Sequence, residues 1–96
     1  MNNNLKQTNL DYPPEEIHVE RDKDLVAYLL CLPEIQFIGA FKDGVTYFRF
    51  YPADKAKEAI DNYFKRLAPP IQPIDLLNAV DRFWNILNEI KRKDLI

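Results

Sequence analysis

The segment from Ile35 to Tyr51, IQFIGAFKDGVTYFRFY, constrains the fold more than any other part of the chain. It carries aromatic residues on both sides of Asp43-Gly44, and aromatic residues are normal strand formers. An Asp-Gly pair favours a two-residue hairpin turn, because both central positions need positive φ. The segment therefore predicts an antiparallel β-hairpin.

A two-residue turn at Asp43-Gly44 fixes which residues oppose each other. The more apolar face, which we expect to build the core, pairs Phe41 with Thr46, Gly39 with Phe48 and Phe37 with Phe50. The other face pairs Ala40 with Tyr47, Ile38 with Arg49 and Gln36 with Tyr51. A slip of one residue would exchange the two faces.

The rest of the chain predicts one strand and three helices. The strand covers Ile17 to Glu20, and the helices cover Asp24 to Leu32, Ala53 to Leu67 and about Pro73 to Arg92. The second helix carries apolar residues at the spacing of an amphipathic helix, namely Ala56, Ala59, Ile60, Tyr63, Phe64 and Leu67. We expect all six to face the core.

These elements predict one α+β domain over residues 17–96, preceded by a flexible N-terminal arm over residues 1–16. A small, mainly antiparallel sheet in the order β-α-β-β-α-α is packed on one face by helices 25–32 and 53–67. A long C-terminal helix closes an edge or mediates association. The sequence leaves open whether the first strand joins beside Ile35–Phe41 or beside Val45–Tyr51.

The run DKDLVAYLL, then FIGAFKDGVTYFRF, then a tyrosine-bearing amphipathic helix and a last long helix resembles a family of small prokaryotic domains of unknown function. The resemblance covers about residues 17–93, and its motifs are structural. The family has no assigned activity. The resemblance therefore implies the α+β layout and assigns no functional residue.

Composition excludes several classes of function. The net charge of −2 argues against a general polyanion binder, because non-specific nucleic-acid affinity comes mainly from Lys and Arg. One cysteine, Cys31, permits neither an intramolecular disulfide nor a Cys/His zinc site. Two glycines, both in the hairpin, leave none for a phosphate-binding loop, and we expect no cofactor. The sequence shows no membrane-spanning run and no secretory signal, so we expect a cytoplasmic location.

The outer row of the hairpin, Tyr47, Arg49 and Tyr51, has no obvious reason to be buried. Two aromatic rings flanking a cation on one strand face could form a stacking platform for single-stranded nucleic acid. The same residues could instead contact another protein, or pack against the last helix or the N-terminal arm.

The last helix carries more apolar residues than one face requires. Its main stripe contains Leu76, Val80, Phe83, Leu87 and Ile90, and a second set contains Leu77, Trp84 and Ile86. Aromatic anchors are enriched at interface centres, so the second set favours a helix-mediated homodimer. The alternative is a helix that caps the sheet and is itself covered by the rest of the chain.

The remaining candidate sites are better explained as ordinary surface or core residues. Asp54, Glu58 and Asp61 share a helix face with interspersed lysines, which is typical of a solvated surface, so we expect no metal site. His18 and Cys31 could form a catalytic pair only if folding brought them together. We therefore expect a non-enzymatic protein-interaction or self-association module, with single-stranded nucleic-acid binding as the alternative.

Overall fold

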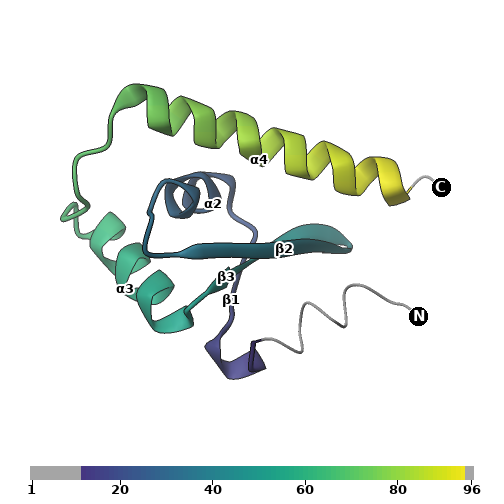
Figure 1. The fold of residues 1–96 in the computed structure, drawn as a ribbon, viewed down its shortest axis with the longest axis horizontal. Helices are drawn as coiled ribbons and strands as arrows, with labels where there is room; N and C mark the ends of the chain where they lie inside the picture. Colours follow the sequence, from purple (N-terminus) through teal and green to yellow (C-terminus); the bar gives the residue numbers. More distant parts are fainter. Residues whose placement is uncertain (1–11, 95–96) are drawn as a thin grey trace.

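The computed structural model describes residues 12–94 and shows an α+β fold with a three-stranded antiparallel sheet and a long C-terminal helix (Figure 1). The elements follow the predicted order after a short 3₁₀ turn. They are η1 (Pro14–Glu16), β1 (His18–Glu20), α2 (Lys23–Leu30), β2 (Gln36–Asp43), β3 (Val45–Tyr51), α3 (Ala53–Phe64) and α4 (Pro73–Asp94).

The predicted arm covers residues 1–16, but regular structure begins within it. Residues 14–16 form η1, which lies against α3, and the ring of Tyr12 lies 4.7 Å from that of Tyr51. Both contacts use residues that a purely flexible arm would leave free. Residues 1–11 of the predicted arm lie outside the described residues.

The strand order is β1-β3-β2, so β3 is the central strand. The first strand therefore joins beside Val45–Tyr51, with His18 opposite Phe50 and Val19 opposite Arg49. His18 shares the inner face of the sheet with Phe50 and is half-buried, while Val19 points to the outer face and is exposed.

The hairpin register differs from the predicted one between Gly39 and the turn. Asp43 pairs with Val45, which leaves Gly44 alone at the turn, and Gly39 opposes Arg49. A β-bulge between Phe37 and Gly39 adds one residue to β2. On the side of the bulge away from the turn, Phe37 pairs with Phe50 and Gln36 with Tyr51, as the sequence predicts. A bulge shifts the alternation of its strand by one residue. The predicted core position of Phe41 is therefore wrong.

The core lies between the inner face of the sheet and the helices. The largest side chains that are fully buried are Phe48, Phe50, Leu29 and Val26, which confirms the predicted inner row of β3. The ring of Phe83 in α4 stacks on that of Phe48 at 5.1 Å. Figure 1 shows α2 between α4 and the sheet, with α3 at one end. In the described part of the chain, α2 and α4 thus pack on the inner side of the sheet, where Phe48 and Phe50 lie.

The helix α3 ends at Phe64 rather than at the predicted Leu67. Arg66 has a φ of 62°, and the N–H of Leu67 donates to the carbonyl of Asn62 at 2.8 Å, which closes the helix with a left-handed turn. The chain turns away at this point. Phe64 and Leu67, predicted to face the core, are 68% and 67% exposed.

Replacing Arg66 by glycine is expected to stabilise the protein, because glycine adopts this left-handed conformation without a Cβ penalty. We expect Arg66→Gly to raise the free energy of unfolding by about 1 kcal/mol. Lys65→Gly is the matched control: Lys65 has a φ of −83°, so glycine there should lower the free energy of unfolding. Urea denaturation measures both, and equal changes for the two variants would contradict the assignment.

Candidate interaction surfaces

The outer row of β3 lies on the face of the sheet opposite to Phe48 and Phe50, and its side chains have neighbours there. The ring of Tyr47 stacks on that of Phe41, with centroids 5.3 Å apart and an angle of 22° between the rings. Phe41 reaches this face because the bulge turns it outward. Tyr47 and Tyr51 are both half-buried.

Arg49 is buried, contrary to the expectation that this row has no reason for burial. Only 6% of the residue is exposed. Its guanidinium carbon lies 5.4 Å from the centre of the Phe41 ring, in the range of a cation–π contact. Burial lowers the pKa of Arg49 from its ordinary value.

Gly39 makes room for this arginine. A Cβ atom on Gly39 would lie 2.8 Å from Nη2 of Arg49, closer than real Cβ atoms come to their neighbours. Gly39 also has a φ of +133°, which side chains of L-residues rarely adopt. Gly39, which the sequence predicts opposite Phe48, thus lies opposite Arg49 and makes space for it on the outer face.

Tyr51 lies beside an acidic group at the start of the fold. The negative charge of Glu16 is the largest cause that raises the pKa of Tyr51, followed by desolvation and by a hydrogen bond with the same carboxylate. Both the charge and the hydrogen bond favour the protonated hydroxyl. Tyr51 thus interacts with Glu16, which precedes β1 in the chain.

Two members of the second apolar set on α4 are exposed together. Leu77 is 63% exposed and Trp84 is 44% exposed. The indole ring meets the buried Phe83 ring edge-on at 5.2 Å, and Nζ of Lys23 lies 6.0 Å from the indole centre. These contacts give Trp84 a defined position at the surface.

Ile86, the third member of that predicted set, lies elsewhere. It follows Trp84 by two residues, or about 200° around a helix of 3.6 residues per turn. Ile86 is half-buried and packs against the core, so its grouping with Leu77 and Trp84 is wrong. Ile74, which the sequence analysis did not single out, is 66% exposed at the start of the same helix. Its i,i+3 spacing from Leu77 was the available signal.

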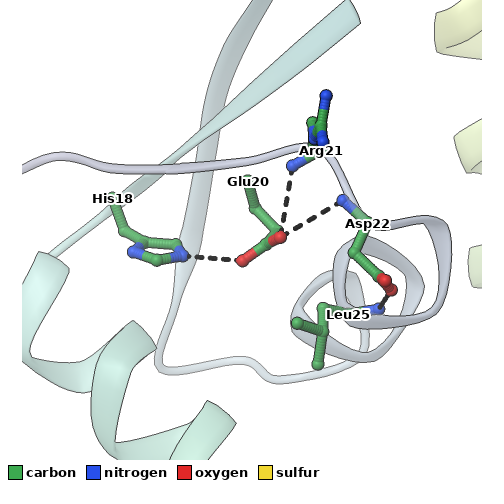
Figure 2. Close-up of polar contacts among 5 residues, drawn as sticks. All are labelled: His18, Glu20, Arg21, Asp22 and Leu25. Carbon is green, nitrogen blue, oxygen red and sulfur yellow. Dashed lines mark hydrogen bonds and ion pairs between the residues drawn. The ribbon is translucent and has the colours of Figure 1, made fainter.

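His18 belongs to a polar cluster that joins β1 to α2 (Figure 2). Its Nε2 lies 3.0 Å from Oε1 of Glu20, and Oε2 of Glu20 accepts hydrogen bonds from the backbone N–H groups of Arg21 and Asp22, each at 3.2 Å. Oδ1 of Asp22 then accepts from the N–H of Leu25 at 3.1 Å and caps α2. The cluster holds the chain in its turn from strand to helix.

Cys31 and His18 contact different residues, which does not favour a catalytic pair formed by these two side chains. Its Sγ lies 3.8 Å from the backbone oxygen of Asp75. Burial, followed by the charge of Asp75, raises the pKa of the Cys31 thiol. A reactive cysteine has a lowered pKa instead.

The helical carboxylates do not converge. Asp54, Glu58 and Asp61 are exposed, and Asp61 forms an ion pair with Lys65 at 2.9 Å. Among residues 12–94, no group of three His, Cys, Asp or Glu side chains could hold a metal ion. No helix in this part of the chain is long and apolar enough to cross a membrane.

A comparison of the chain with protein-family models, curated proteins and solved structures found no match. The resemblance to a family of small prokaryotic domains stays a prediction.

Replacing Gly39 by alanine should destabilise the protein more than the same change at Gly44. Both glycines have positive φ, but nothing lies within 4 Å of a Cβ on Gly44, whereas Arg49 blocks one on Gly39. We expect a loss of about 3 kcal/mol for Gly39→Ala and about 1 kcal/mol for Gly44→Ala in urea unfolding. Equal losses would show that Arg49 yields without cost.

Replacing Glu16 by glutamine should lower the pKa of Tyr51 toward its ordinary value. The change removes the negative charge that opposes ionisation of the hydroxyl. A titration followed by the NMR signal of the Tyr51 ring measures the shift, and Glu15→Gln is the matched control. An unchanged titration in Glu16→Gln would place the cause elsewhere.

Proposed function

We propose that this protein is a non-enzymatic self-association module in which α4 of one copy packs against α4 of a second copy. The observation that supports it is the exposure of Leu77 and Trp84 on a helix that already packs another of its faces against the core. Apolar side chains of this size on one exposed helix face are typical of a surface that a partner covers.

The spacing of the exposed row suits a helix pair. Leu77, Val80, Trp84 and Leu87 follow one another at steps of three, four and three, which is the seam of a two-helix coiled coil. Val80 and Leu87 are half-buried, so they line the seam where it meets the rest of the domain. The row spans about 15 Å along the helix.

A twofold axis at the middle of this row would pair it with itself. In an antiparallel arrangement Leu77 would meet Leu87 of the second copy, and Val80 would meet Trp84 of the second copy. Contacts of this kind are isologous, the form that most homodimers use. Trp84 would be the anchor, because Phe83 holds its ring in place before association.

The outer sheet face supports the alternative less well. Arg49 would have to supply an exposed cation for a nucleic-acid backbone, yet it is buried beside Phe41. Tyr51 would have to offer a free ring, yet Tyr12 lies against it. We also propose a cytoplasmic setting, which is supported by the fact that a single cysteine cannot form a disulfide within the chain.

Replacing Leu77 by aspartate should abolish self-association. Light scattering on wild-type protein should show the mass rising from that of one chain toward that of two as concentration increases. Leu77→Asp should stay at the mass of one chain, because a carboxylate in the seam would be desolvated without a partner. Leu77 is exposed, so the thermal unfolding of the variant should match that of the wild type at concentrations where the wild type is also a single chain.

The matched control is Asn85→Asp, which adds the same charge at an exposed position of α4 outside the row. It should associate as the wild type does. A wild-type protein that keeps the mass of one chain at every concentration would remove the proposal.

A further inference from the structure

A groove lies between the loop that follows α2 and the connector that leads into α4. Its cavity has a volume of about 460 Å³. Residues 31–34 and residues 69–72 line it, together with Asp75 in the first turn of α4. Both connecting segments lie at the end of the molecule where α4 begins (Figure 1). The groove is thus built mainly from residues outside the regular helices and strands.

The walls of the groove are apolar and stiff. Pro33, Pro69 and Pro70 are exposed there, and each proline ring fixes its own φ. Leu32 is buried and Ile71 is half-buried, so their side chains add hydrocarbon surface to the lining. Walls of this kind need little ordering when a ligand binds, which lowers the free-energy cost of association.

The charged groups of the groove are both acidic. Glu34 and Asp75 line it, and none of the described residues around it is basic. In the described part of the chain, neither carboxylate forms an ion pair with a basic side chain. The start of α4 contributes about half a positive charge, which two carboxylates outweigh. The groove therefore keeps a negative charge without a partner.

Two groups beside the groove respond to this charge. Burial is the largest cause that raises the pKa of Tyr28, and the charge of Glu34 is the next. Burial is also the largest cause that raises the pKa of the Cys31 thiol, followed by the charge of Asp75. Each carboxylate thus disfavours a further negative charge in this region.

The charge and the walls together select the occupant. A phosphate or another anion would be repelled by both carboxylates. A purely apolar side chain would remove water from them without offering a partner, which costs free energy. A metal ion lacks ligands, because no group of three His, Cys, Asp or Glu side chains within residues 12–94 could hold one. The occupant that fits carries a positive charge on a hydrocarbon stem.

We propose that this groove binds an arginine side chain of a partner protein, with its stem on the proline rings and its guanidinium at the two carboxylates. Arginine suits the site better than lysine, because a guanidinium is less strongly hydrated and has five N–H donors to share between two acids. The cavity lies within the range of about 300–1,000 Å³ found for ligand sites, so the side chain fits together with neighbouring residues of its segment.

The proposed arginine site does not depend on self-association. Asp75 and Leu77 are two residues apart, or about 200° around a helix of 3.6 residues per turn. The groove therefore lies on a different side of α4 from the Leu77–Trp84 row, and a protein that stays a single chain would still carry it.

The test uses the full chain and two matched pentapeptides, acetylated and amidated, with arginine or citrulline at the centre between alanine residues. Citrulline has nearly the shape of arginine but no charge. The arginine peptide at millimolar concentration should shift the NMR signals of the amides of Glu34, Ile71 and Gln72. The citrulline peptide should bind about fivefold more weakly or less well still. Ethylguanidinium, which carries the same charge without a peptide, should also bind more weakly.

Glu34→Gln should weaken binding of the arginine peptide about threefold and leave that of the citrulline peptide unchanged. The matched control is Glu89→Gln, at an exposed position of α4 that does not line the groove, and it should bind as the wild type does.

Four results would each overturn the proposal. They are no shift at millimolar arginine peptide, equal binding of the arginine and citrulline peptides, equal weakening by the two glutamate variants, and binding of ethylguanidinium as tight as that of the arginine peptide. Groove signals that move when the protein alone is diluted would show that a second copy fills the groove, which would also overturn it.

Discussion

The bulge in β2 is the constraint on which the rest of the structure depends. One added residue between Phe37 and Gly39 changes which side chains face the core above it. Ala40, rather than the predicted Gly39, then stands opposite Phe48 on the inner face, and Phe41 moves to the outer face. The ring of Phe83 stacks on Phe48, and that contact holds α4 against the sheet.

The same bulge determines what the outer face can do. It places Phe41 beside Tyr47 and leaves room over Gly39 for the side chain of Arg49. A row that contains two tyrosines and an arginine in the sequence thus becomes a packed surface in which the cation is covered. The open side of a sheet is usually polar and solvated, and here aromatic rings and one arginine take the place of a second layer of helices.

The sequence predicts the hairpin and its inner row because strand-forming aromatic residues and a turn dipeptide are local signals. Phe48 and Phe50 are buried as expected, and the pairing below the bulge is the expected one. The bulge was not predicted, although an isolated glycine within a strand is a known signal for one. Gly39 carries that signal, and its φ of +133° is the conformation that the bulge requires.

The helices show a similar division between local and tertiary causes. The spacing of α4 predicts two apolar rows, but which residues join the buried one depends on where α2 and β2 lie. Ile86 packs against the core, whereas Leu77 is exposed. At the end of α3, the left-handed turn at Arg66 leaves Phe64 and Leu67 exposed, although their periodicity alone places them inside.

The rotation of α4 determines which of its residues stay available to a partner. Phe83 is fixed in the core, so every other residue of this rigid helix has a set direction around it. Trp84 follows Phe83 by about 100° and Ile86 by about 300°, which places the two side chains on opposite flanks of the buried row. A second copy on the Trp84 side would therefore leave the Ile86 flank of α4 uncovered.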